Sequence, residues 1–330
     1  MGPERGEAKA LRLLVTGASG FIGRHLVRQA VTDGHEVIGT YLAPDELQAR
    51  DLPRSGVTWE RLDMRDADRV AHLVDAVRPE GVFHLAAQCY AKVAWADPAE
   101  TFRINVLGTI YLYEALRKHP PIRGTLLASS GAGYGSPDEL PIREEFPLNP
   151  TNPYGVSKAC QDMLSLQYSL NFGLRILRAR LFGTSGPGKT GDVINDFAQQ
   201  IAAIERTGRP GKLKVGNLDP LRDVSDVRDV LRAMWRIFEA GDPMVPINVG
   251  AGRSYPVRAI AEQLQKLARV PIEITPEPTL LRPTDERDNR ADISRLRALG
   301  YAPSFTLAQT LEDSLNFWRE GLASAPGKPE

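Results

Sequence analysis

The chain has 330 residues, with 41 lysines and arginines balanced by 41 aspartates and glutamates, so its formal net charge is zero. This length suggests about two domains, and the balanced charge argues against a nucleic-acid-binding or membrane-surface protein. Two separated cysteines, Cys89 and Cys160, indicate neither a disulfide framework nor a zinc site. The first apolar run is too short for a signal peptide or a membrane span. We therefore expect a cytoplasmic protein without a metal site.

Strands and helices are expected to alternate through the first half of the chain. Short apolar runs predict the strands, and amphipathic stretches between them predict the helices. The expected strands are residues 11–16, 36–40, 57–62, 81–86, 123–129 and 174–180, and the expected helices are 21–32, 66–78, 98–118 and 153–172. This alternation predicts an α/β fold of the Rossmann type, a doubly wound parallel sheet with helices on both faces.

Three glycines follow the first expected strand, within the sequence VTGASGFIG at residues 15–23. Glycine permits a sharp turn and lets backbone N–H groups approach a pyrophosphate at the N-terminus of a helix. The spacing is a variant of the dinucleotide-binding motif, although a glycine-rich turn without a ligand is the alternative. The motif predicts cofactor contacts from Gly17, Ser19, Gly20, Phe21, Ile22 and Gly23.

The chain changes character twice after the fifth expected strand. Five prolines between residues 137 and 153 predict an irregular segment at the carboxyl edge of the sheet, where open α/β folds bind ligands. Beyond residue 183 we expect helices near 191–206, 225–240, 256–269 and 306–320, and strands near 212–216, 245–249 and 271–275. The division predicted is a polar tail (1–10), a dinucleotide-binding domain (11–183), a smaller substrate-binding domain (184–323) and a second tail (324–330).

Tyr154 and Lys158 begin the helix that follows the proline-rich segment. Residues four apart share one face of a helix. A neighbouring ammonium favours the phenolate and lowers a tyrosine pKa from about 10, so Tyr154 could exchange a proton near neutral pH. Ser130, at the end of the fifth strand, could hydrogen-bond the same substrate oxygen, or it could simply cap the strand end.

These motifs, in this order, resemble the short-chain dehydrogenase/reductase superfamily, specifically its extended branch, the NAD-dependent epimerase/dehydratase family that acts on nucleotide sugars. The resemblance covers about residues 11 to 320. It implies that Tyr154 is the catalytic acid/base, that Lys158 holds the nicotinamide ribose, and that Ser130 orients the oxygen at sugar carbon 4, where hydride is transferred. It also implies cofactor contacts from Asp63, Met64, Leu85, Ala86, Ala87, Asn105 and Phe182, and a substrate contact from Gln88.

The second half of the chain is similar to the subgroup that acts on GDP-hexoses. Segments 215–218, 222–230, 248–255 and 281–283 carry this resemblance, which is closest to GDP-4-keto-6-deoxy-mannose reductases and next to GDP-mannose 4,6-dehydratases. It implies that Arg222 and Arg282 hold the diphosphate of a GDP-linked sugar, because the planar guanidinium pairs bidentately with phosphate. Each could instead be a surface arginine paired with Asp223 or Asp285.

Gly131 and Ala132 follow Ser130, where dehydratases of the family carry additional acid/base groups. Neither side chain can move a proton, which disfavours elimination. Reduction of a GDP-4-keto-6-deoxy-hexose is therefore the expected reaction. The alternatives are a 4-epimerase that retains NAD, then a GDP-mannose 4,6-dehydratase, and outside the enzymes a non-catalytic protein that senses cofactor state.

Three further points stay open in the sequence. The second strand ends at Thr40 and Tyr41, with neither an acidic residue for the adenosine ribose nor an arginine for a 2′-phosphate, although Arg24 or Arg28 could reach one. NAD and NADP therefore remain alternatives. Gly183 stands where the family has an asparagine, which is compatible with an atypical substrate. The resemblance implies a homodimer formed by the helices near 98–118 and 153–172, unless their apolar stripes simply face the sheet.

Overall fold

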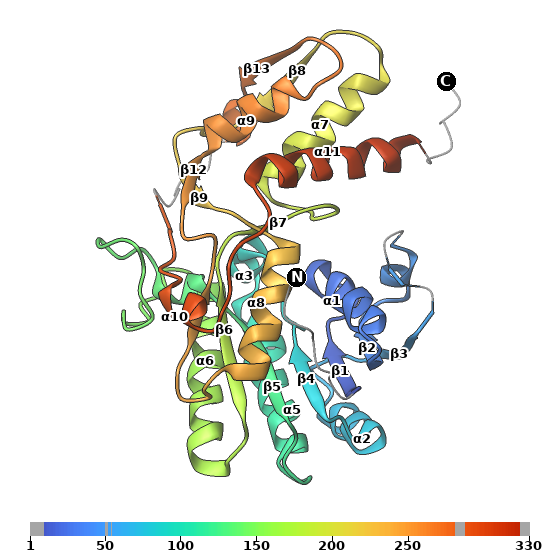
Figure 1. Cartoon of the computed structure of the whole chain (residues 1–330), viewed down its shortest axis with the longest axis vertical. Helices are drawn as coiled ribbons and strands as arrows, with labels where there is room; N and C mark the ends of the chain where they lie inside the picture. The colour runs from blue at the N-terminus through green and yellow to red at the C-terminus, as the bar shows by residue number, and fades with distance from the viewer. Residues whose placement is uncertain (1–9, 50–51, 54, 281–287, 324–330) are drawn as a thin grey trace. The chain divides into compact units, whose positions relative to one another are not determined.

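The computed structural model describes residues 10–49, 52–53, 55–280 and 288–323. The chain folds into two compact units (Figure 1). The first unit consists of the chain up to Gly135, Pro147–Arg180 and Met234–Pro246, and the second consists of Ser136–Phe146, Leu181–Ala233 and the chain from Ile247. The chain passes between the units at Arg180, near the division expected at residue 183. Residues 136–146 precede this point but belong to the second unit, and residues 234–246 follow it but belong to the first. A single boundary therefore does not describe the division of the chain.

A seven-stranded sheet has the strand order β11-β6-β5-β4-β1-β2-β3, and the pairs from β5 to β3 are parallel (Figure 1). Its strands are β1 (Arg12–Thr16), β2 (Glu36–Tyr41), β3 (Val57–Arg61), β4 (Gly81–His84), β5 (Gly124–Ser130), β6 (Ile176–Leu181) and β11 (Ile247–Val249). Chain order reverses between β1 and β4, which is the topological switch point of a Rossmann sheet. The predicted α/β fold is confirmed.

Helices flank this sheet in the first unit. They are α1 (Phe21–Thr32), α2 (Ala67–Val77), α3 (Ala91–Ala96), α4 (Pro98–Phe102), α5 (Gly108–Leu116) and α6 (Pro153–Phe172). The single helix expected over 98–118 consists of α4, a π-helical turn, η2 (Arg103–Leu107), and α5. Three short helices were not predicted: α3, η1 (Pro44–Gln48) and η3 (Gly131–Tyr134). Each is too short to show a helical period in the sequence.

Side-chain caps fix where several of these helices begin. Asp66 accepts a hydrogen bond from the backbone of α2, Asp97 does so for α4, and Asn152 does so for α6. Proline follows two of these caps at the first helical position, where its missing N–H costs no helix bond. The beginning of α6, which carries Tyr154 and Lys158, is thus set by local sequence.

The two faces of the sheet bury different groups. Val82 on β4 joins a buried cluster with Leu14 and with Tyr113 of α5. Its neighbour Phe83 points to the opposite face, because successive strand residues alternate. There it packs 4.8 Å from the ring of Trp235, centroid to centroid. The strands are therefore apolar on both faces, as a parallel sheet covered by helices requires.

The second unit has its own core. Its helices are α7 (Val193–Arg206), α9 (Val257–Lys266), α10 (Ser294–Ala298) and α11 (Leu307–Ala323), and α8 (Val227–Ala240) begins in it. Its short strands are β7 (Thr184–Ser185), β8 (Gly211–Val215), β9 (Leu221–Asp223), β10 (Ser225–Asp226), β12 (Ser254–Pro256) and β13 (Ile272–Pro276), followed by η4 (Pro278–Leu280). Ile201, Leu264 and Leu311 are fully buried where α7, α9 and α11 meet. The four expected helices are confirmed, and β7, β9, β10 and β12 were too short to predict.

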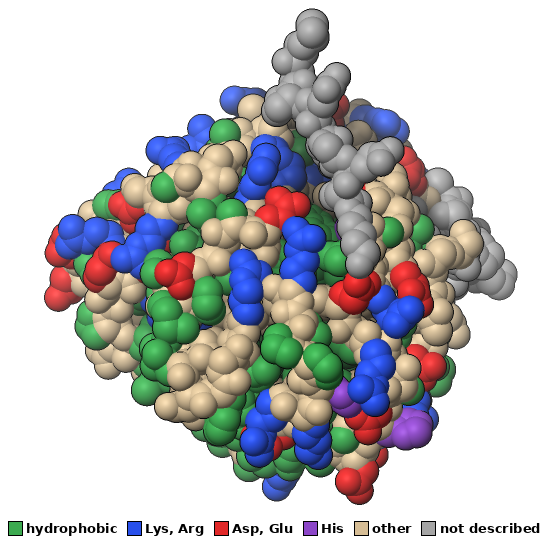
Figure 2. Space-filling view, turned by 60° about the horizontal axis from the view of Figure 1, so that its bottom comes forward, with side chains coloured by type: hydrophobic (Ala, Val, Ile, Leu, Met, Phe, Trp, Pro, Cys, Tyr) green, Lys and Arg blue, Asp and Glu red, His purple; other side chains and the backbone are tan. Residues whose placement is uncertain are grey.

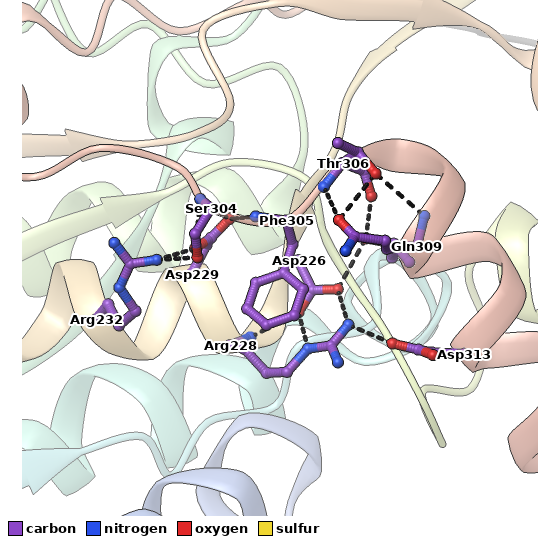
Figure 3. A network of polar contacts seen from close by, with 10 residues as sticks. Asp226, Arg228, Asp229, Arg232, Ser304, Phe305, Thr306, Gln309 and Asp313 are labelled. Atoms are coloured by element: carbon purple, nitrogen blue, oxygen red, sulfur yellow. Dashed lines mark hydrogen bonds and ion pairs between the residues drawn. The ribbon is translucent and has the colours of Figure 1, made fainter.

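A polar network joins the beginning of α8 to the segment before α11 (Figure 3). Asp229 accepts hydrogen bonds from the backbone N–H groups of Ser304 and Phe305, at 3.0 Å each. Arg228 forms an ion pair with buried Asp226 at 2.7 Å, and its guanidinium lies 3.7 Å from the centre of the Phe305 ring. Because both carboxylates are buried, these partners are needed to compensate their desolvation.

The proline-rich segment is irregular, as expected. Between η3 and α6, its one β contact with the described part of the chain is an isolated bridge of Ile142 to Ala291. Among the described residues, no helix has the length and apolar character needed to span a membrane. Acidic and basic side chains are interspersed on the face shown in Figure 2, in keeping with the balanced composition.

Candidate active site

The glycine loop turns tightly between β1 and α1. Gly17 has a φ of +68°, and a Cβ added there would lie 2.8 Å from backbone atoms of Ala86. A Cβ on Gly23 would lie 2.3 Å from the carbonyl oxygen of Gly17. Gly20 forms the N-cap of α1 and offers no side-chain cap. The loop therefore has the close backbone approach and the helix N-terminus that suit a pyrophosphate.

The segment after β4 lies against this loop. The backbone N–H of Leu85 donates to the carbonyl of Thr16 at 3.1 Å, and that of Ala86 donates to its hydroxyl at 3.3 Å. The structure thus brings Gly17 together with Leu85 and Ala86, and Ala87 follows directly. These residues meet at the switch point of the sheet, and their predicted cofactor contacts stay a prediction.

Two expected adenine contacts follow β3. Asp63 pairs with Arg65, and hydrogen bonds from that guanidinium hold the pKa of Asp63 below its usual range. The Met64 side chain is buried in the core, where a Cβ on Gly108 would lie 2.7 Å from it. Its side chain therefore serves packing, and a cofactor contact from Met64 would have to come from its backbone.

Ser130 and Tyr154 are brought together at the end of β5. The Ser130 hydroxyl lies close enough to the Tyr154 phenol to favour its ionised form. The Ser130 hydroxyl also accepts from the N–H of Ala132 at 3.1 Å, so it caps η3 at the same time. The two interpretations of Ser130 offered by the sequence, a strand-end cap and a hydroxyl that bonds the same substrate oxygen as Tyr154, are therefore compatible.

The expectation that Lys158 lowers the pKa of Tyr154 is wrong for this structure. Burial raises the pKa of Tyr154 to about 12, and the nearby Ser130 hydroxyl opposes this only in part. Lys158 donates instead to the carbonyl of Ala128 at 2.7 Å and to Oε1 of Gln161 at 2.8 Å. Sharing a helix face did not bring its ammonium to the phenol, because buried acceptors on β5 and α6 hold it.

Lys158 itself is almost fully buried, at 4% exposure. Desolvation lowers its pKa to about 8, and the nearby carboxylate of Asp162 opposes this only in part. Its ammonium is therefore largely charged at pH 7 and loses its proton as the pH rises through about 8. Two of its three N–H donors are used by the protein contacts just described.

A buried chain of hydrogen bonds continues from Lys158. Oε1 of Gln161 accepts the hydrogen bond from Lys158, and Nε2 of Gln161 donates to the hydroxyl of Thr109 at 2.6 Å. Thr109 in turn donates to the carbonyl of Asn105 at 2.6 Å and lies 2.9 Å from Nε2 of His84. Because the one Thr109 proton goes to Asn105, His84 must donate from Nε2.

The other side of His84 completes this chain. Its Nδ1 lies 2.8 Å from the hydroxyl of Thr16, which then donates to it. Burial, together with the charge of Lys158, lowers the pKa of His84 to about 3, so the ring is neutral at pH 7. Sequence reasoning missed Gln161, Thr109 and His84. The available signals were a glutamine three residues after Lys158 and a histidine at the end of a strand.

Asn105 fixes the loop that carries Gln88. Its Oδ1 accepts from the backbone N–H of Gln88 at 2.8 Å, and its Nδ2 donates to the carbonyl of Gln88 and to the Ser157 hydroxyl. The Gln88 amide donates to Thr101 at 2.9 Å. The structure therefore gives Asn105 a positioning contact within the protein, and its predicted cofactor contact stays a prediction.

The remaining predicted site residues belong to the second unit. Phe182 is buried and donates its backbone N–H to Val249 at 2.9 Å. Arg222 lies on β9 and donates to the carbonyl of Leu221 at 2.9 Å. Asp223 accepts from the backbone of Ala251, Gly252 and Ala291, and burial raises its pKa to about 6. Arg282 lies outside the described residues.

A Rossmann sheet with a glycine loop at its switch point and a serine, tyrosine and lysine beside it defines an oxidoreductase of the short-chain dehydrogenase/reductase type. Residues 14–314 match the family described as GDP-mannose 4,6 dehydratase. The chain is 38% identical to GDP-6-deoxy-D-mannose reductase of Pseudomonas aeruginosa over 93% of its length and 97% of the relative. It is 32% identical to UDP-glucose 4-epimerase of Mycolicibacterium smegmatis over 94% of its length and 99% of the relative.

Solved structures agree with these relatives. The structure of RMD from Pseudomonas aeruginosa complexed with NADPH has a TM-score of 0.79 at 36% identity and covers 94% of this chain and 100% of that one. UDP-glucose 4-epimerase from Thermotoga maritima with UDP-glucose has a TM-score of 0.85 at 26% identity, with 94% and 99% covered. The chain belongs to the GDP-mannose 4,6-dehydratase family, within the extended short-chain dehydrogenase/reductases.

Proposed function

We propose that this protein is a nucleotide-sugar reductase, which uses a reduced nicotinamide cofactor to reduce the ketone at carbon 4 of a GDP-4-keto-6-deoxy-hexose. The observation that carries the proposal is the contact of Ser130 with Tyr154 at the cofactor edge, followed by Gly131 and Ala132. This set can transfer a proton at one oxygen, and the two residues after Ser130 offer no second acid/base group. The 38% sequence identity with a GDP-6-deoxy-D-mannose reductase supports the proposal.

The residues of the first unit fit a dinucleotide. The space that a Cβ on Gly17 would need is filled by the Ala86 backbone, and α1 begins at the end of the same loop. The pyrophosphate would be held there by backbone N–H groups. Lys158 would direct its third N–H toward the nicotinamide ribose. When bound, the reduced nicotinamide supplies the hydride.

Tyr154 would act as the acid in this reaction. As the ketone carbon accepts a hydride, its oxygen takes the proton of the Tyr154 hydroxyl, and Ser130 donates a hydrogen bond to the same oxygen. A pKa of about 12 keeps the phenol protonated at neutral pH, which suits proton donation. The tyrosinate formed then recovers its proton from solvent.

A nucleotide-sugar 4-epimerase is the second candidate. The same serine, tyrosine and lysine serve hydride transfer in either direction, and several relatives are named UDP-glucose 4-epimerase. An epimerase must first oxidise carbon 4, so its tyrosine has to begin as a base. A reductase instead needs the protonated phenol, so the two reactions differ in the protonation state with which Tyr154 begins.

We further propose that the protein is a cytoplasmic homodimer. Met163 and Leu170 on α6 are 64% and 63% exposed, and Leu107, on the adjoining η2 turn, is 41% exposed. Exposed apolar side chains of this size favour a protein partner. The family resemblance implies a second copy of the same helices as that partner.

The test combines cofactor release with turnover. The purified protein is denatured, and the released cofactor is identified by mass spectrometry. Separate samples receive GDP-4-keto-6-deoxy-mannose with NADH or NADPH, while absorbance of the reduced nicotinamide is followed. Consumption of one reduced cofactor per sugar supports the reductase. A further sample receives GDP-mannose without added cofactor. Retained NAD, with that sugar converted and no net change in cofactor, would instead indicate an epimerase or a dehydratase.

A further inference from the structure

The short helix η1 (Pro44–Gln48) carries a carboxylate back to the glycine loop. Oε2 of Glu46 accepts a hydrogen bond from the Ser19 hydroxyl at 2.5 Å and another from the backbone N–H of Leu42 at 3.1 Å. Ser19 lies within the glycine loop, and Leu42 is the first residue after β2. The Glu46 carboxylate therefore lies at the carboxyl ends of β1 and β2, although it is five residues beyond the last residue of β2.

This is the place where a Rossmann sheet receives the adenosine ribose. In that fold an acidic residue about 20 residues beyond the glycine motif accepts hydrogen bonds from the ribose hydroxyls. The last residues of β2 cannot do so here: Thr40 and Tyr41 carry no carboxylate, and the Thr40 hydroxyl accepts from the N–H of Gly17 at 3.1 Å. Glu46 supplies the missing carboxylate from η1.

We propose that Glu46 determines the cofactor preference of this protein by accepting hydrogen bonds from the 2′- and 3′-hydroxyls of the adenosine ribose and repelling a 2′-phosphate. A carboxylate is an acceptor only, so two ribose hydroxyls can take the place of the Ser19 and Leu42 donors. A 2′-phosphate brings a second anion to the same position. The protein therefore binds NADH more tightly than NADPH.

Basic groups on β3 and α1 define the opposing case. Arg61 on β3 donates from Nε to the carbonyl of Leu42 at 3.2 Å, so a guanidinium flanks the same residue as Glu46. Arg24 on α1 lies 5.5 Å from the centre of the Phe21 ring. Such cations would favour a 2′-phosphate, but Glu46 is the group that is bonded to the glycine loop itself. Removing the charge of Glu46 should therefore let these arginines attract a 2′-phosphate.

The inference rests on the proposed function only in taking a nicotinamide dinucleotide as the cofactor. The test measures dissociation constants of the full-length protein for NADH and NADPH by calorimetry, without any sugar. Like charges brought together at a binding site weaken association, so the wild type should bind NADH at least about 30-fold more tightly. Glu46→Gln should bring the two constants within about threefold, by weakening NADH and strengthening NADPH.

Glu36→Gln is the matched control, because Glu36 begins β2, at the end of that strand opposite to Leu42 and Glu46, and pairs with Arg12 on the surface. It should leave both constants unchanged. Equal or tighter binding of NADPH by the wild type overturns the inference, and so does an unchanged ratio in folded Glu46→Gln. If that variant does not fold, the wild-type ratio decides alone.

The outcome is separable from that of the proposed function. NADH preference without sugar reduction would leave the inference standing and overturn the reductase. Sugar reduction with tighter NADPH binding would overturn the inference and leave the reductase standing. A protein that binds neither dinucleotide would overturn both.

Discussion

The lysine end and the adenosine end of the cofactor edge are built in opposite ways. At the lysine end, Lys158, Gln161 and Thr109 are almost fully buried, and their polar atoms are joined in one chain of hydrogen bonds. At the adenosine end, Glu46 is half-buried on a five-residue helix at the surface. Groups that need a fixed position and a shifted pKa thus lie in the core. The group that selects the cofactor lies on a short segment that can change without disturbing the core.

Loss of the Tyr154 hydroxyl should have the largest effect. Tyr154→Phe removes the proton donor, and acid/base groups contribute about 10²- to 10⁴-fold, so turnover should fall at least about 100-fold. The NADH dissociation constant should stay within about twofold, because the phenyl ring is kept. Steady-state kinetics and calorimetry measure the two quantities. Tyr111→Phe on α5 is the control, and more than a tenth of activity remaining in Tyr154→Phe would refute the assignment.

Gly17→Ala should remove cofactor binding and destabilise the fold. Its φ is +68°, and its Cβ would lie 2.8 Å from the Ala86 backbone. Gly34→Ala is a matched control, since Gly34 has a φ of +83° with nothing within 4 Å of a Cβ. That variant should cost only about 1 kcal/mol, the backbone penalty alone. Urea unfolding of both variants checks this, and equal losses would show that the close approach is unimportant.

Thr109→Val should test whether the buried chain acts as a unit. It leaves the Gln161 and His84 donors without their shared acceptor, which should lower the free energy of unfolding by about 2 kcal/mol. Thr32→Val is the control, because the Thr32 hydroxyl donates to the carbonyl of Arg28 in its own helix, at the surface. Urea unfolding measures both. A loss below about 0.5 kcal/mol in Thr109→Val would mean that the chain contributes little.

The smallest change expected is a shift in pH dependence. The pKa of Lys158 is lowered to about 8, so its ammonium is present below that pH and is lost as pH rises through it. NADH affinity should fall over the same range. Gln161→Glu places an anion beside Lys158 and should move the midpoint up by about 1 unit, whereas Gln161→Met should move it down. Calorimetric titrations on both sides of pH 8 test this, and shifts in the same direction would contradict it.

Local sequence alone predicted the sheet, the glycine loop and the Tyr154–Lys158 pair. Strand and helix periodicity is a local property, and Asn152 and Pro153 fix where α6 begins. The need for glycine at position 17 was also visible, since its spacing implied a sharp turn that the φ of +68° bears out.

Only the tertiary structure decided how these groups act. The direction of the Tyr154 pKa depends on burial, and the position of Lys158 depends on acceptors from β5 and α6. The link from Gln161 to Thr109 joins residues 52 apart, and the link from Glu46 to Ser19 joins residues 27 apart. Periodicity carries no information on contacts at such separations, because they form only when distinct elements pack together.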